Sequence, residues 1–333
     1  MATSVEKKLR IVGKRLPKLD APQKVMGQTI YADDLRMPGL LVGAVLRSPH
    51  PHARIRSIDI SAAERLPGVR AVIHAGNVQQ RPFGYNRDNI PLKPDKVRFI
   101  GDEVAAVAAI DEKTARLALE LIRVDYELLP AVFDPFAALG EGAPAIHDEL
   151  PGVSGNVSMR WDFEDGDVDG AAARAAAVVA GRYSTPQAAP APIETHAVIA
   201  SFDPNGHLTV WSPVHMVFMY RKELADCLGL DWQRITVVQP PVGGSFGGKI
   251  DIDPHDFIAV MLARATRRPV KLVMSREEEF HRHTDAPAAR RGPLFSSSFE
   301  GEVDRDRTVA SVGGGHHATI RLHDQHLTGE PFV

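Results

Sequence analysis

The most informative run of the sequence is Pro241-Val242-Gly243-Gly244-Ser245-Phe246-Gly247-Gly248-Lys249, which places four glycines in six positions. Such a density of glycine indicates a backbone that bends sharply or passes close to another group. Residues 235–238 precede the run with a strand-like pattern, and Asp253-Pro254 follows it as a helix start, since proline is tolerated at the first helical position. The sequence therefore predicts a strand, a glycine turn and a helix. Backbone N–H groups gathered at the positive end of that helix would favour an anionic or phosphate-bearing ligand.

Two nucleotide-binding motifs fail in this run. Gly243, Gly248 and Lys249 match the spacing of a P-loop, but Ile250 stands where serine or threonine should bind Mg²⁺. No Gly-x-Gly-x-x-Gly register fits either, which argues against a dinucleotide fold. A tight glycine turn without any ligand remains an alternative at this point, because glycine turns are common.

The rest of the chain alternates short strands and helices, which predicts an α+β fold with helices against a mostly antiparallel sheet. Strands are expected at 41–46, 55–60, 69–74, 124–127, 197–202, 208–211 and 270–274, and helices at 111–121, 166–180, 218–228, 254–267 and 276–280. Asn205-Gly206 between two apolar runs predicts a hairpin, and Gly229 should end a helix. The buried stripe of helix 254–267 is expected at Phe257, Ile258, Met261, Leu262 and Ala265.

Changes in composition divide the chain into two units. We expect a first domain over 20–133, a glycine- and proline-rich linker over 134–160, and a second domain over 161–333. Residues 1–19 resemble a basic arm, and the segment after Arg291 shows little periodicity.

Composition narrows the class of protein. The 333 residues carry a net charge of −3, which gives no general electrostatic reason to bind nucleic acid. The single cysteine, Cys227, cannot hold an iron–sulfur cluster, which needs about four thiolates, and we interpret it as a small buried apolar residue. Because no signal peptide and no long apolar run occur, we expect a cytoplasmic protein without a membrane partner.

Other polar residues are candidates for further sites. His50, His52 and His196 are interpreted as polar residues at domain contacts. The histidines at 316, 317, 323 and 326 form a tract that could bind zinc or nickel, although no helix aligns them. The run Glu277-Glu278-Glu279 is expected to be a solvated helix face.

Across residues 10–290 the sequence resembles the molybdopterin-binding subunit of the xanthine dehydrogenase/aldehyde oxidase family. The resemblance follows many motifs in the family's order: Val12-Gly13-Lys14, residues 20–27, Tyr31–Leu35, Leu46–Ile55, Leu66–Val69, Gly101–Val107, Val124–Glu127, Pro192–Ala197, the glycine turn, Arg268–Lys271 and Ser275–Glu278. Pro254-His255 and residues 276–280 look most like the branch that includes 4-hydroxybenzoyl-CoA reductase.

This resemblance implies an a/b-hammerhead domain followed by an incomplete first molybdopterin-binding domain. It implies a molybdopterin cofactor, with the cytosine dinucleotide form as one option, contacted by Gly243, Gly244, Ser245, Phe246, Gly247, Gly248 and Gln187. Phe246 would lie near molybdenum without being a ligand. The family oxidises aldehydes or aromatic and heteroaromatic substrates with oxygen from water. It passes electrons through 2Fe-2S clusters to FAD, which we expect on partner subunits.

The sequence also departs from the family. Ala188 stands where many relatives have a glutamine near molybdenum, and Gln187 is one position away. Ile250 replaces a substrate-binding glutamate found in some relatives, which disfavours a purine. The family's catalytic glutamate lies in a later part of a longer chain and is absent here, so we expect this chain to be inactive alone. A separate C-terminal molybdopterin-binding chain would complete it. The alternative is a truncated, non-catalytic or assembly-only paralogue that keeps the fold without cofactor.

Overall fold

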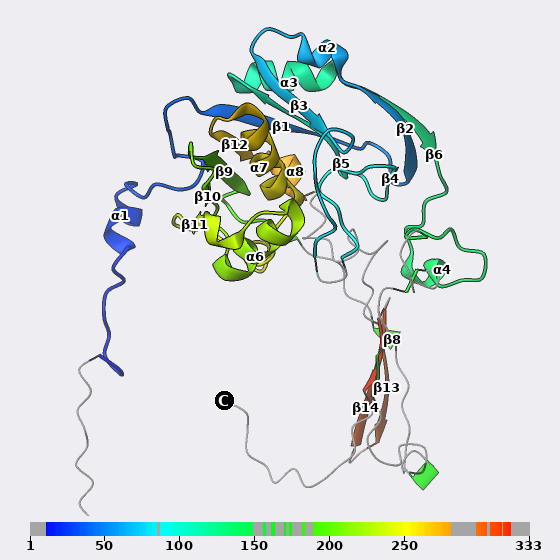
Figure 1. Cartoon of the computed structure of the whole chain (residues 1–333). Helices are drawn as coiled ribbons and strands as arrows, with labels where there is room; N and C mark the ends of the chain where they lie inside the picture. The colour runs from blue at the N-terminus through cyan, green and yellow to red at the C-terminus, as the bar shows by residue number, and fades with distance from the viewer. Residues whose placement is uncertain are drawn as a thin grey trace, which may run out of the picture.

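A computed structural model describes residues 11–84, 87–148, 156–157, 161–163, 170, 173–174, 182–183, 189–280, 298–304, 307–314 and 316–320. Its centre is a seven-stranded sheet with the order β11-β10-β9-β12-β1-β5-β3 (Figure 1). The strands are β1 (Leu41–Arg47), β3 (Val69–His74), β5 (Glu103–Ala109), β9 (Ala197–Phe202), β10 (Leu208–Trp211), β11 (Ile235–Val238) and β12 (Val270–Val273). Four of its six neighbouring pairs are antiparallel, which, with the helices packed on it, confirms the α+β prediction.

The seven-stranded sheet joins the two halves of the chain. β1 pairs in parallel with β12, with Leu41 opposite Val270, although these strands are more than 200 residues apart in the sequence. On its other side β1 pairs antiparallel with β5. The N-terminal strands therefore extend the sheet that carries the glycine turn.

Helices cover the two faces of this sheet. Strand β5 is buried along its whole length, and its residues alternate between two cores. Ala106 and Ala108 lie in the core formed with α7 (Pro254–Thr266), whereas Ala105, Val107 and Ala109 pack with α3 (Glu112–Glu120). A strand covered on both faces needs apolar residues at every position, and small alanines allow both helices to approach closely.

Helix α7 is the central helix of the second half. It packs on β9 and β12 and contacts α6 (Val217–Leu228), which precedes the 3₁₀ turn η1 (Trp232–Arg234). Every residue from Pro254 to Ala263 is buried, so the predicted apolar stripe is too narrow. The predicted burial of Ala265 is wrong, because the last turn of α7 leaves the core and exposes this residue.

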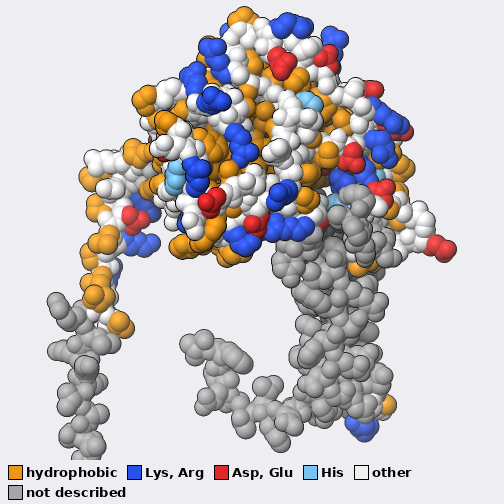
Figure 2. Space-filling model, viewed as in Figure 1, with side chains coloured by type: hydrophobic (Ala, Val, Ile, Leu, Met, Phe, Trp, Pro, Cys, Tyr) orange, Lys and Arg blue, Asp and Glu red, His pale blue; other side chains and the backbone are white. Residues whose placement is uncertain are grey.

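Smaller elements surround the central sheet. A three-stranded sheet has the order β4-β2-β6, formed by Lys96–Val97, Ala53–Asp59 and Arg123–Leu128. Short helices are α1 (Ala21–Val25), α2 (Ser61–Glu64), α4 (Pro135–Ala138) and α8 (Arg276–Phe280). The segment that contains α1 leaves the body of the molecule and exposes apolar side chains such as Leu19 and Val25 (Figures 1 and 2).

Three segments after Arg291 are strands, although the sequence there shows little periodicity. Strands β13 (Ser298–Asp304), β14 (Arg307–Gly314) and β15 (His316–Ile320) form a second sheet with β7 (Trp161–Phe163) and β8 (Arg182–Tyr183), in the order β7-β15-β14-β13-β8. Most of the helix predicted over 166–180 lies outside the described residues, as do His323 and His326. Among the described residues, no helix combines the length and apolarity that crossing a membrane requires.

Candidate functional site

The glycine turn connects β11 to α7 as predicted, but it is not continuous with the helix. Five residues, 249–253, separate Gly248 from the first residue of α7. The helix start is closed by its own side chain, since the backbone N–H of Asp253 donates to Oδ2 of Asp256 at 3.0 Å. The prediction that the turn shares the positive end of this helix is therefore wrong, and any anion-binding property must come from the turn.

The two ends of the turn are held by hydrogen bonds. The N–H of Gly243 donates to Oε2 of Glu194 at 2.7 Å. At the other end, the N–H of Gly248 donates to the carbonyl of Ser245 at 2.8 Å, and the N–H of Lys249 donates to Oγ of Ser245 at 3.1 Å. These bonds fix the backbone on both sides of the segment 244–247.

The middle of the turn presents open donors. Within the described part of the chain, the backbone N–H groups of Gly244, Ser245, Phe246 and Gly247 donate no hydrogen bond. Gly244 and Gly247 have φ of +105° and +96°, a region that favours glycine. Successive N–H groups in such a turn form a concave donor surface for anionic groups. The residues present therefore fit the phosphate and oxo groups of a pterin cofactor.

Phe246 is the exposed side chain of the turn. It is 76% exposed and has φ of +50°, which is unusual for a residue other than glycine. A large aromatic side chain in a strained backbone on the surface indicates that the geometry serves a contact with another group. Ile250, just after the turn, is also exposed.

Behind the turn lies a group of buried polar residues. His196 is buried, and its Nδ1 lies 2.9 Å from Oε1 of Glu279 while its Nε2 lies 3.2 Å from the carbonyl of Gly248. Glu279 is only 1% exposed, so the expectation of a solvated face across Glu277–Glu279 is wrong for this residue, whereas Glu277 is exposed. Consecutive residues point in different directions around a helix, and His196 is the partner that lets Glu279 point inwards.

Asp253, His255 and Asp256 bring metal-ligand types of atoms within 4.8 Å of one another, and all three are buried. The Asp256 carboxylate, however, already accepts hydrogen bonds from the hydroxyl of Tyr220 at 2.7 Å and from the N–H of Asp253. Burial, followed by the charge of Asp256, raises the pKa of Tyr220 well above its usual value. We assign this cluster to closing the start of α7.

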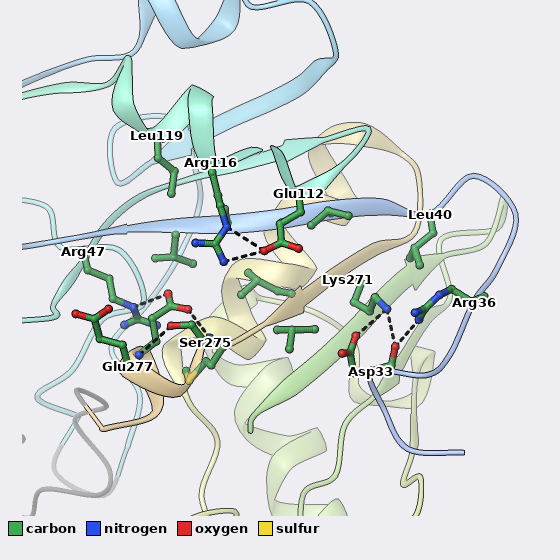
Figure 3. Close-up of a pocket in the computed structure, with 18 residues that line it drawn as sticks. Asp33, Arg36, Leu40, Arg47, Glu112, Arg116, Leu119, Lys271, Ser275 and Glu277 are labelled. Carbon is green, nitrogen blue, oxygen red and sulfur yellow. Dashed lines mark hydrogen bonds and ion pairs between the residues drawn. The ribbon is translucent and has the colours of Figure 1, made fainter. Parts of the chain in front are cut away.

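A separate pocket of about 770 Å³ lies over β1 and β12, and no residue of the glycine turn lines it (Figure 3). Its charged side chains largely satisfy one another. Nζ of Lys271 lies 2.9 Å from Oδ1 of Asp33, and Arg116 pairs with Glu112 at 2.8 Å. This internal pairing makes the pocket a weaker candidate than the turn.

The remaining predicted residues have structural partners or lie outside the described range. His52 is buried with Nδ1 2.6 Å from the carbonyl of Pro130, and burial lowers its pKa. Cys227 is buried, as expected. Gln187 and Ala188 lie outside the described residues. Sequence reasoning missed the contacts of Glu194 with the turn, because they join residues about 50 positions apart.

The fold and the glycine turn define a cofactor-binding α+β protein, and comparisons with known proteins specify it further. Residues 26–130 match the family pattern described as aldehyde oxidase and xanthine dehydrogenase, a/b hammerhead domain. Residues 146–290 match the molybdopterin cofactor-binding domain. The chain belongs to the xanthine dehydrogenase and aldehyde oxidase family and corresponds to part of its large, molybdopterin-binding subunit.

Similar proteins agree with this assignment. The nicotinate dehydrogenase large molybdopterin subunit of Eubacterium barkeri is 37% identical over 274 residues, which cover 82% of this chain and 63% of that protein. The carbon monoxide dehydrogenase large chain of Afipia carboxidovorans is 33% identical over 321 residues, which cover 88% of this chain and 40% of that protein. The crystal structure of quinoline 2-oxidoreductase from Pseudomonas putida 86 aligns with a TM-score of 0.73 at 29% identity, over 88% of this chain and 37% of the other. The chain thus spans between about two fifths and three fifths of these relatives.

Proposed function

We propose that this chain is the cofactor-binding portion of the large subunit of a molybdenum-dependent dehydrogenase or oxidase. The observation that carries the proposal is the row of four open N–H donors at 244–247, held between two fixed ends and next to the exposed Phe246. The nicotinate dehydrogenase and quinoline oxidoreductase relatives support an aromatic or heteroaromatic substrate, and the similar structure of the aldehyde oxidoreductase from Desulfovibrio gigas supports an aldehyde.

The residues that would hold molybdopterin are Gly243, Gly244, Ser245, Phe246, Gly247 and Gly248, with Gln187 as a further contact. In this proposal the backbone N–H groups of 244–247 would donate hydrogen bonds to oxygen atoms of the cofactor. The cytosine dinucleotide form of the cofactor would add a second phosphate. Phe246 would lie near molybdenum without being a ligand, and its exposed ring would offer an apolar face to a flat substrate. When bound, the cofactor supplies two-electron oxidation at molybdenum.

The proposed enzyme needs other polypeptides. Because the chain has one cysteine, we place the 2Fe-2S clusters on a partner subunit, and we expect FAD on a further partner subunit. We retain 20–133 and 161–333 as the two domains, with 134–160 as the linker, and the cytoplasm as the compartment.

The test is the molybdenum content of the purified chain, produced with the products of its neighbouring genes and then alone. We expect molybdenum in the first preparation, and at least a tenfold loss in Gly247→Asp, which puts a carboxylate among the open donors. Gly142→Asp is the matched control: Gly142 has φ of +80°, Gly247 has +96°, and neither has a neighbour within 4 Å of an added Cβ. If neither wild-type preparation contains molybdenum, the chain is a non-catalytic or assembly-only paralogue instead.

A further inference from the structure

Glu194 connects three separate parts of the chain beneath the glycine turn. Its Oε2 accepts from the N–H of Gly243 at 2.7 Å and from Nζ of Lys249 at 2.8 Å, so one carboxylate oxygen contacts both ends of the turn. Its Oε1 accepts from the N–H of Ala32 at 3.4 Å, in the N-terminal half. Its own N–H donates to the carbonyl of Gly243 at 3.2 Å.

The position of Glu194 explains why residue 243 is glycine. A Cβ added at Gly243 would lie 2.5 Å from Cβ of Glu194, which is closer than two such atoms can approach. The backbone of the turn therefore rests directly on Glu194. This close approach places the carboxylate under the Gly243 N–H and within reach of Lys249.

The ion pair between Glu194 and Lys249 is shielded from water. The side chain of Lys249 is 1% exposed and that of Glu194 is 11% exposed. Nζ of Lys249 also donates to the backbone carbonyl of Glu194 at 2.8 Å. A buried pair of this kind adds little net stability compared with an apolar pair, but it fixes geometry. The location of this ion pair beside the turn points to a role in positioning the backbone of the turn.

We propose that Glu194 is a positioning residue for the cofactor: by accepting the Gly243 N–H and pairing with Lys249, it sets the turn so that the N–H groups of 244–247 point outwards. This inference rests on the function proposed above. Lys249 is the counter-charge that pairs with Glu194 beneath the turn. The contact between Nε2 of His196 and the carbonyl of Gly248 stabilises the same end of the turn as Lys249 does.

Single substitutions would leave a buried charge without its partner and would destabilise the fold. Two double variants avoid this problem. Glu194→Gln with Lys249→Met removes both charges but leaves an amide oxygen that can accept the Gly243 N–H. Glu194→Met with Lys249→Met removes both charges and also the acceptor. The two proteins differ only in the group beneath Gly243.

Hydrogen exchange of the peptide 240–249, followed by mass spectrometry, is the first readout and does not require cofactor. We expect the amide of Gly243 to remain protected in the Gln/Met variant and to exchange at least tenfold faster in the Met/Met variant. Thermal unfolding of both variants shows whether they are equally folded. Equal exchange in the two folded variants would overturn the inference.

The second readout is molybdenum and pterin per chain, in preparations made with the neighbouring gene products. The Gln/Met variant should keep its cofactor within about twofold of wild type, and the Met/Met variant should lose at least tenfold at an unchanged unfolding midpoint. Equal loading of the variants refutes the positioning role. A wild-type chain without molybdenum refutes the proposed function instead, while the exchange experiment still decides the role of Glu194.

Discussion

The glycine turn and the start of α7 both contain successive backbone N–H groups, yet they use them differently. At the helix start, Asp256 accepts the N–H of Asp253 and is itself enclosed by Tyr220. In the turn, side chains hold only the ends, and the N–H groups of 244–247 stay open. The comparison shows that a helix start near a glycine run is not automatically an anion site, because the chain can supply its own carboxylate.

The closed helix start should carry most of the stability. In Asp256→Ala, the Tyr220 hydroxyl and the Asp253 N–H lose a buried acceptor. Because each unsatisfied buried donor costs about 1–3 kcal/mol, the free energy of unfolding should fall by roughly 2–6 kcal/mol. Urea unfolding followed by circular dichroism measures this loss.

Tyr220→Phe is the control for that variant. It removes one hydroxyl and leaves the Asp256 carboxylate with its bond from Asp253, so the loss should be only about 1 kcal/mol. Equal losses in the two variants would show that the closed helix start is not the stabilising feature.

The Gly243 end of the glycine turn should not tolerate a larger side chain. In Gly243→Ala the new Cβ would lie 2.5 Å from Cβ of Glu194, so the backbone must shift. Overpacking of this kind costs about 1–3 kcal/mol, and we also expect at least a tenfold loss of molybdenum. Thermal unfolding and elemental analysis measure the two effects.

Gly43→Ala is the matched control in β1, where the added Cβ would meet the Leu272 side chain at 3.2 Å. A side chain can adjust more easily than the backbone beside Glu194, so the loss of stability should be smaller and the molybdenum content unchanged. Loss of molybdenum in Gly43→Ala would contradict a specific role for the turn.

Two residues with the same backbone strain separate function from stability. Phe246 in the turn and Arg267 at the end of α7 have φ of +50° and +52°. Replacing either by glycine should relieve strain and raise the free energy of unfolding by about 0.5–1 kcal/mol. Only Phe246→Gly should lower the turnover of the assembled enzyme, because only this ring lies beside the open donors. Unchanged turnover in Phe246→Gly would show that the Phe246 ring does not contribute to the reaction.

Local signals predict the elements well. Asn205-Gly206 joins β9 to β10, Gly229 ends α6 in a left-handed conformation, and Asp111 caps α3 through the N–H of Thr114. Each of these features depends on neighbours within a few residues, so the sequence contains the necessary information. The glycine turn can be located for the same reason.

Long-range pairs cannot be predicted in this way. Glu279 is buried because His196, 83 residues earlier, provides its partner. Glu194 contacts Gly243 and Lys249 because β9 and β11, which lie next to them in the sequence, belong to the same sheet. The strands β13–β15 escape prediction because their glycine- and serine-containing sequence does not alternate clearly, and a sheet partner rather than a local pattern defines them.

The smallest expected effect concerns Cys227. This residue lies on α6, the helix whose Tyr220 contacts Asp256 at the closed start of α7. The side chain is 1% exposed and Sγ donates to the carbonyl of Arg81 at 3.0 Å. Burial raises the pKa of this thiol from 9.0 to about 11. Because the thiolate is the nucleophile, iodoacetamide at pH 8 should leave the native protein unmodified and react readily after denaturation.

The raised pKa of Cys227 also makes the free energy of unfolding fall as the pH rises. The folded state favours the neutral thiol, so its contribution is fully present below pH 9 and is lost as the pH rises towards 11. The difference in unfolding free energy between wild type and Cys227→Ala should therefore stay constant up to about pH 8.5 and shrink above it. Subtracting the variant removes the contribution of Tyr220, whose pKa is also raised. Rapid alkylation of the native protein, or a difference in unfolding free energy that does not change with pH, would mean that α6 opens and exposes Cys227 to solvent.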